Sequence, residues 1–166
     1  KVESYFMKIK NIEIFTDNKK VTLSGKIILK NDKTYEVYFK TDKENKDYVA
    51  KDASPFLAVS LMLAMKLGED LYIEGSISET LFHQTKRIMA LLADWNVGFK
   101  KVKIYPDFLL KNEKEWSFIG SFFSGGVDSF YTLLKNKKED RDKITHLILV
   151  HGFDIELEYT SLFQEI

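Results

Sequence analysis

The residues best suited to chemistry in this sequence are six consecutive ones, Ser124-Gly125-Gly126-Val127-Asp128-Ser129, between an apolar segment and a predicted helix. The N-terminus of a helix presents unpaired N–H groups and a partial positive charge. Two consecutive glycines let backbone amides wrap around an anion and permit a positive φ. The hydroxyls of Ser124 and Ser129 add further donors. The segment is therefore a candidate phosphate-binding loop.

Asp128 is unusual in such a loop because its carboxylate would repel a phosphate. Two interpretations stay open. In the favoured one, the carboxylate binds Mg²⁺, which in turn meets the phosphates. In the other, Asp128 only caps the helix by accepting backbone N–H bonds.

Three better-known loop motifs do not fit this segment. A Walker A loop needs a lysine after its second glycine, and a dinucleotide fingerprint needs G-x-G-x-x-G spacing. A nucleophile elbow needs glycine where this sequence has Phe122. A strand-to-helix turn that binds no ligand remains the structural alternative.

The SGGVDS segment resembles the PP-loop of the N-type ATP pyrophosphatases, which belong to the adenine nucleotide alpha hydrolase-like superfamily. All five fixed positions of the S-G-G-x-D-S pattern match. The resemblance covers about residues 117–155. The chain is also similar to bacterial proteins in which an N-terminal α/β domain precedes segments like FFSGGVDSFYTLL and HLILVHGFDI.

The resemblance implies an ATP-dependent, AMP-forming enzyme of the ligase or synthetase type. A substrate oxygen attacks the α-phosphate, pyrophosphate leaves, and ammonia, an amine or sulfur displaces the adenylate. Asp128 would position Mg²⁺ and act as the catalytic residue. The resemblance also implies a set of nucleotide-binding residues: Ser124, Gly125, Gly126, Val127 and Ser129 at the phosphates, and Val150, His151 and Gly152 near the adenine. Catalysis at such a site is mainly positioning and charge neutralisation.

The segment His151-Gly152-Phe153-Asp154 allows two interpretations. In one, His151 touches the nucleotide and Asp154 binds a metal ion or a ribose hydroxyl. In the other, which we favour, Gly152 turns the chain while His151 packs. The three histidines are too scattered to predict a zinc site.

Composition excludes several classes of protein. The chain has 166 residues, 45% of them hydrophobic, with 25 basic and 25 acidic side chains and no cysteine. This hydrophobic content is enough for a packed core, and the balanced charge gives no reason to expect a nucleic-acid partner. Disulfides and thiolate zinc sites are excluded. The longest apolar stretch, 56–65, is too short to span a membrane, and no signal peptide is visible, so we expect a cytoplasmic protein.

The first part of the chain predicts an α+β domain over residues 1–116. Strands are expected at 7–16, 21–30 and 34–40, the last two from alternating apolar residues, in a half-buried antiparallel sheet. A helix should begin at an N-cap Ser54 and end at Gly68. A short strand at 71–74 precedes a second helix, whose start is indicated by the capping-box spacing of Ser76 and Glu79.

The inner faces of these two helices follow from apolar spacing. For the first helix the inner residues are Leu57, Leu61, Ala64 and Met65. For the second they are Leu81, Thr85, Ile88, Leu92 and Trp95, with Gly98 ending the helix. A further strand is expected at 101–105, before Pro106.

The second part, residues 117–166, follows a charged joint at 111–115. Apolar strands at 117–123 and 145–150 flank a helix at 127–136, which predicts a βαβ unit with two buried parallel strands. We interpret it as the first unit of a truncated, Rossmann-like PP-loop domain. Two strands bury little surface, so we expect one of two arrangements. Either the chain is a fragment of a longer protein, or a partner or a second copy supplies the missing strands, as in a homo-oligomer or a swapped dimer. This piece alone should lack full turnover.

Three functions are compatible with this organisation. The first is a PP-loop enzyme that uses ATP and Mg²⁺ on a small-molecule substrate that the sequence does not identify. The second is a non-catalytic interaction module with a vestigial loop. The third, a sulfur-transfer enzyme of the tRNA-modifying kind, is disfavoured within this piece by the absence of cysteine.

Overall fold

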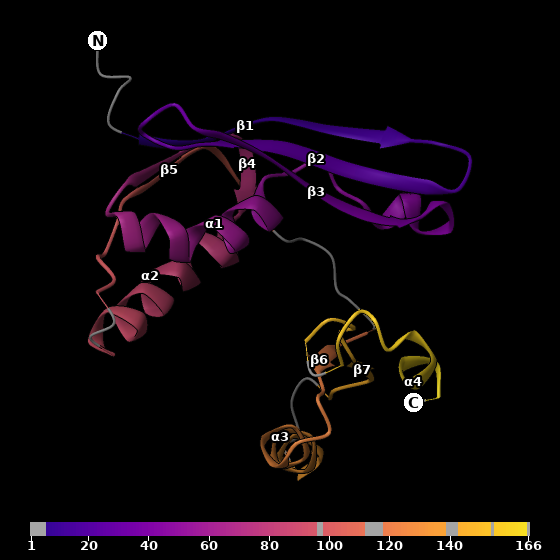
Figure 1. Ribbon diagram of the computed structural model, residues 1–166. Helices are drawn as coiled ribbons and strands as arrows, with labels where there is room; N and C mark the ends of the chain where they lie inside the picture. Colours follow the sequence, from indigo (N-terminus) through magenta and orange to yellow (C-terminus); the bar gives the residue numbers. More distant parts are fainter. Residues whose placement is uncertain (1–5, 96–97, 112–117, 139–142, 154, 166) are drawn as a thin grey trace. The chain divides into compact units, whose positions relative to one another are not determined.

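The protein is an α/β chain that divides into two compact units, residues 1–112 and 113–166. The structure, a computed structural model, describes residues 6–95, 98–111, 118–138, 143–153 and 155–165 (Figure 1). Of the expected joint at 111–115, only Lys111 lies within the described residues.

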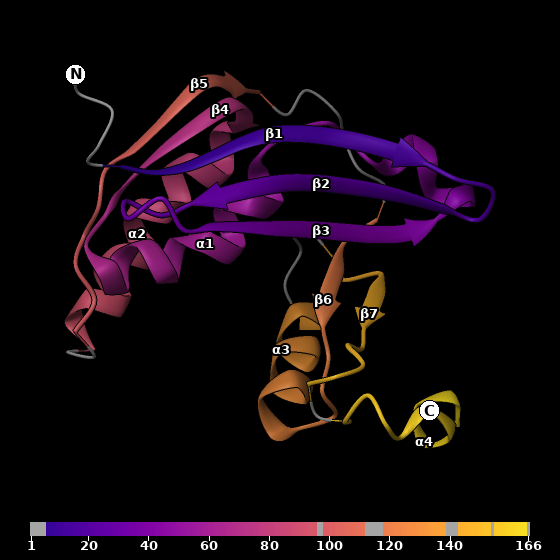
Figure 2. The same cartoon turned by 45° about the horizontal axis from the view of Figure 1, so that its top comes forward.

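A mixed five-stranded sheet forms the frame of the first unit, in the order β3-β2-β1-β4-β5 (Figure 2). Strands β1 (Phe6–Thr16), β2 (Lys20–Ile28) and β3 (Thr34–Asp42) pair antiparallel, which confirms the prediction for these three. β4 (Asp70–Ser78) runs parallel to β1, and β5 (Ile104–Leu110) runs parallel to β4.

Alternation along β2 places one set of side chains in the core. Val21, Leu23, Gly25 and Ile27 are all buried, as their spacing predicts. On β3 the residues opposite them are Tyr35, Val37 and Phe39, which therefore share that face. Tyr35 and Phe39 nevertheless stay more than one third exposed, because β3 is the outermost strand and has a neighbour on one side only.

Helices α1 (Ser54–Leu67) and α2 (Glu79–Asp94) cover one face of the sheet (Figure 1). A short 3-10 helix, η1 (Lys43–Tyr48), follows β3. The predicted inner face of α1 is confirmed, and its members pack into one core with side chains from β1, β2 and β4. Gly68 ends α1 with φ 69°, and its N–H donates to the Ala64 carbonyl at 2.7 Å.

The predicted start of α1 is wrong by one residue. Ser54 is the first helical residue and Ala53 is the N-cap. Asp52 Oδ1 accepts the N–H of Ser54 at 2.7 Å, while the Ser54 hydroxyl accepts the N–H of Ser78 at 2.9 Å. Ser54 therefore joins the start of α1 to the end of β4.

The predicted start and inner face of α2 also need correction. The N-cap is Ser78, whose hydroxyl accepts the N–H of Leu81 at 3.3 Å, and Ser76 lies inside β4. The inner face is confirmed for Thr85, which is buried, and for Leu81 and Leu92, which pack partly buried against the core, but it also contains Met89. Ile88 and Trp95, expected to face inward, are 41% and 63% exposed.

The last strand of the unit is displaced along the chain from the predicted 101–105. β5 contains Pro106, which faces Ile73 of β4. Proline lacks a donor and is tolerated in an edge strand whose N–H would point to solvent. The pairing of β4 with β5 is irregular between Ile73 and Ser76, and Gly75 there has φ 103°.

The second unit contains the predicted strand–helix–strand. β6 (Gly120–Phe122) and β7 (His146–Ile148) pair parallel, with α3 (Val127–Lys138) between them in sequence. A short helix, α4 (Thr160–Gln164), was not predicted. The expected burial of both strands is wrong for this chain: Phe122 is 72% exposed and Leu147 48% exposed.

Candidate functional site

The glycine loop leaves the carboxyl end of β6 and leads directly into α3. Phe123 N–H donates to the Ile148 carbonyl at 2.9 Å, so the loop begins where β6 is still tied to β7. Phe130 N–H donates to the Gly126 carbonyl at 3.1 Å and closes the first helical turn. The Ser129 hydroxyl donates to the same carbonyl at 2.8 Å. These bonds fix Gly126 as the residue at which loop becomes helix.

Gly125 has the backbone conformation that favours glycine. Its φ is 76°, in the left-handed region, and an added Cβ would find no heavy atom within 4 Å. Gly126 has no positive φ, and its added Cβ would lie 3.4 Å from Ser124 Oγ. The first glycine is thus required by the path of the chain, while the second leaves the backbone open to a close approach.

The amides of the loop are open to solvent. Among the described residues, no acceptor receives the N–H of Gly125, Val127, Asp128 or Ser129. The Gly126 N–H reaches Ser124 Oγ only at 3.4 Å. Residues 124–128 are all exposed. Open donors at the start of a helix are what an anion needs, because they combine hydrogen bonding with the favourable end of the helix dipole.

Asp128 lies in the first turn of α3 with an exposed side chain. Within the described part of the chain, its carboxylate takes part in no hydrogen bond or ion pair, so it does not cap the helix as the alternative interpretation required. Only its main-chain carbonyl is engaged, by the Thr132 hydroxyl at 2.9 Å. The described residues contain no group of three or more carboxylate or histidine side chains placed to hold a metal ion.

A hollow of about 130 Å³ adjoins the loop. Its polar lining comes from Ser124 and Ser129, and its other walls are apolar. The apolar residues are Phe122, Phe123, Ile148, Val150 and Phe153. The structure therefore brings Val150, two residues after the end of β7, to the same hollow as two of the loop serines.

The other residues expected near the adenine are engaged elsewhere. The His151 ring stacks on Phe163 of α4, with centroids 4.3 Å apart and an interplanar angle of 6°. Its Nε2 lies 3.0 Å from the Glu156 carbonyl oxygen. Gly152 has φ 99°, and its N–H donates to the Ile155 carbonyl at 2.7 Å. Gly152 thus turns the chain and His151 packs, which agrees with the favoured interpretation, while Asp154 lies outside the described residues.

Sequence reasoning missed the aromatic part of the hollow. Phe123 forms an edge-to-face contact with Phe130 of α3, with centroids 5.0 Å apart. Phe153 was interpreted only as part of the segment around His151. The available signal was the position of the Phe122–Phe123 pair, directly before the serine of the loop.

Comparison of the chain with protein-family models, with curated proteins and with solved structures finds no match. Among the described residues, no helix has the length and apolar character needed to cross a membrane.

Proposed function

We propose that this chain carries the ATP-binding corner of a PP-loop ATP pyrophosphatase, within a truncated Rossmann-like domain. One observation carries the proposal. The SGGVDS loop has open amides and lies at the carboxyl end of one of two parallel strands. In open α/β sheets, ligands bind outside the carboxyl ends of the strands, and helix N-termini there receive phosphates.

The loop residues fit the triphosphate tail of ATP. The N–H groups of residues 125–129 and the hydroxyl of Ser124 are the donors, and the glycines allow the close approach that a phosphate requires. The side chain of Asp128 accepts no protein hydrogen bond, so it is available to Mg²⁺. Mg²⁺ commonly uses one or two protein carboxylates together with substrate phosphates, so a single aspartate is compatible with such an ion.

The proposed chemistry is adenylation of a substrate oxygen with release of pyrophosphate. Bound ATP supplies the electrophilic α-phosphate and the leaving group. The loop amides hold the negative charge of the tail, and Ser124 and Ser129 orient it. The apolar walls around Phe123 and Val150 exclude water from one side of the tail. These are contributions of position and charge, which account for most of the catalysis expected in phosphoryl and nucleotidyl transfer.

The second candidate, a non-catalytic interaction module, is favoured by a different observation. Both strands of the second unit expose large apolar side chains: Phe122 of β6 is 72% exposed and Leu147 of β7 is 48% exposed. Exposed apolar surface of this kind commonly marks a contact with another protein surface. In that case the loop would be a strand-to-helix turn without a ligand.

Isothermal titration calorimetry with ATP and Mg²⁺ separates the two candidates. We expect the unaltered chain to bind. Gly126→Val should abolish binding, because its side chain fills the approach to the amides. Asp128→Ala should retain binding but lose the gain in affinity that Mg²⁺ provides. Lys137→Ala, at the far end of α3, is the matched control and should bind normally. Absence of binding by the unaltered chain supports the non-catalytic module.

A further inference from the structure

The two edges of the five-stranded sheet differ in how they are protected against pairing. The β5 edge carries Pro106 and an irregular ladder, both of which hinder the addition of another strand. The β3 edge has neither. Its nine residues pair with β2 in unbroken register from Thr34 to Asp42. β3 also contains no proline and exposes Tyr38 to 62%. A long, regular edge of this kind is a template for another strand.

The register shows which backbone groups of β3 are free. Leu29 N–H donates to the Lys33 carbonyl, and Lys43 N–H donates to the Lys19 carbonyl, each at 2.9 Å. Hydrogen-bonded pairs alternate along an antiparallel ladder, so the odd-numbered residues of β3 face β2. The even-numbered residues direct their N–H and C=O groups away from the sheet. They are Thr34, Glu36, Tyr38, Lys40 and Asp42.

The sequence of β3 is complementary to itself when the strand is reversed about Tyr38. In an antiparallel pair of two β3 strands centred there, Glu36 of one copy faces Lys40 of the other, and the second Glu–Lys pair follows by symmetry. On the opposite face, Val37 meets Phe39. Opposite charges and apolar pairs directly across a ladder are both favourable.

This register is also the one that uses the whole strand. All five outward-facing residues find partners, which gives about ten backbone hydrogen bonds. A shift of two residues in one direction removes both Glu–Lys pairs, and a shift in the other direction places Glu36 opposite Asp42. An exposed lysine on an edge strand disfavours pairing with another strand, and the charge of Lys40 is compensated by Glu36 in one register only.

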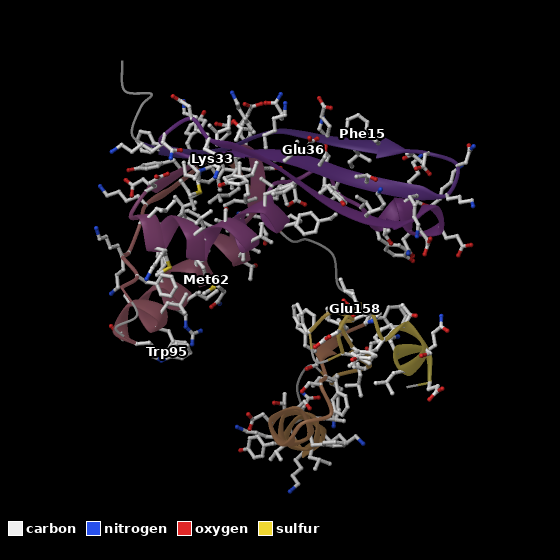
Figure 3. All side chains as sticks on the ribbon, in the orientation of Figure 1. Phe15, Lys33, Glu36, Met62, Trp95 and Glu158 are labelled. Atoms are coloured by element: carbon white, nitrogen blue, oxygen red, sulfur yellow. The ribbon has the colours of Figure 1, made fainter. Side chains whose placement is uncertain are left out.

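We propose that two copies of this chain associate through antiparallel pairing of their β3 strands, centred on Tyr38, to form one continuous ten-stranded sheet. A two-fold axis normal to the sheet keeps both helical layers on the same side. Within the described residues, neither Glu36 nor Lys40 forms a salt bridge; Lys40 Nζ lies over the ring of Tyr38 at 5.4 Å. Glu36 lies on the face of the sheet away from the helices, where a partner strand can reach it (Figure 3).

Charge reversal tests the register as well as the association. Sedimentation velocity of the full chain should show a dimer that dissociates on dilution. Glu36→Lys and Lys40→Glu each place like charges opposite one another twice per dimer. Each should weaken association by at least about tenfold. An equimolar mixture of the two variants should form a heterodimer, because Lys faces Glu at all four positions. The double variant should again form a homodimer.

Matched controls and a variant-free measurement complete the test. Lys10→Glu and Glu13→Lys make the same charge changes on β1, inside the sheet, and should dimerise normally. Hydrogen exchange should show that the amides of Glu36, Tyr38 and Lys40 become protected as the concentration of the unaltered chain rises. A chain that stays monomeric, or a dimer unaffected by both charge reversals, would overturn the proposal.

Discussion

Replacement of Gly125 by alanine tests whether the conformation of the loop matters for binding. An alanine Cβ there would meet no atom within 4 Å, so no steric clash with neighbours is expected. The cost comes from the backbone alone, because φ is 76°. An L-residue with a Cβ pays about 1–2 kcal/mol in the left-handed region. If the free loop relaxes to another conformation, the affinity for ATP and Mg²⁺ should fall by about 5–30-fold.

Two further variants isolate the cause. Gly125→Asn should lose less affinity than Gly125→Ala, because asparagine tolerates the left-handed region better. Gly126→Ala carries no such backbone cost, and its Cβ meets only Ser124 Oγ at 3.4 Å. Any loss of affinity in Gly126→Ala therefore reports the approach of the phosphate and not the conformation of the loop.

The assay is isothermal titration calorimetry, with far-UV circular dichroism to verify that each variant is folded. The order expected for affinity is the unaltered chain, then Gly125→Asn, then Gly125→Ala. Equal affinities for the alanine and asparagine variants would refute the argument from φ. An unchanged affinity in Gly125→Ala would show that the free and the bound loop carry the same conformational cost at residue 125, so that binding does not depend on this φ.

Three other predictions concern the first unit. Gly25→Ala places a Cβ 2.9 Å from Cε1 of the buried Phe56. The free energy of unfolding, measured with urea, should fall by about 1–3 kcal/mol, and Phe56→Leu in the same chain should restore part of it. Backbone N–H bonds from Lys19 and the residue after it lower the pKa of Asp17 below its usual 3.8. The ionised Asp17 therefore stabilises the fold at pH values above 3.8, and this stabilisation disappears as the pH falls through the lowered pKa. Asp17→Asn should remove this part of the pH dependence of the free energy of unfolding, measured between pH 6 and 2. Ser78→Ala removes the N-cap of α2 and should cost about 0.5–2 kcal/mol, again by urea unfolding, and more than the same change two residues earlier.

The sequence predicted elements whose signals are local. The polar breaks after the first two strands and the glycine after α1 mark their ends because turns and αL caps need particular residue types. Alternation in β2 predicted its buried face for the same reason. Burial of Tyr35 and Phe39 was less complete than alternation implies, because it depends on whether a strand has one neighbour or two.

The predictions were wrong where contacts between elements distant in the sequence determine the end of a strand or the buried face of a helix. β4 continues to Ser78 because Ser76, Ile77 and Ser78 pair with β5, so the capping serine moves from 76 to 78. The second helix offers apolar residues at both 88 and 89, and packing against the sheet selects Met89. Spacing alone cannot distinguish these neighbours, since both lie close to the same helix face.

The candidate site shows the same division between local and distant information. The strand–loop–helix order and the glycine conformation at Gly125 follow from adjacent residues. The stack of His151 on Phe163 does not, because α4 was not predicted and the contact joins separate elements. The unpaired amides of residues 125 and 127–129 were also predicted from adjacent residues. Tertiary contacts could have supplied acceptors for these N–H groups, and among the described residues they do not.

The most direct test of the central claim is to observe the loop amides while ATP and Mg²⁺ are added. In ¹⁵N-labelled protein, glycine amides give resolved signals, and Gly25 and Gly68 serve as internal controls in the first unit. We predict saturable shifts of the Gly125 and Gly126 signals, stronger with ATP than with AMP because the triphosphate tail supplies the contacts. Unchanged Gly125 and Gly126 signals at saturating ATP and Mg²⁺ would contradict it.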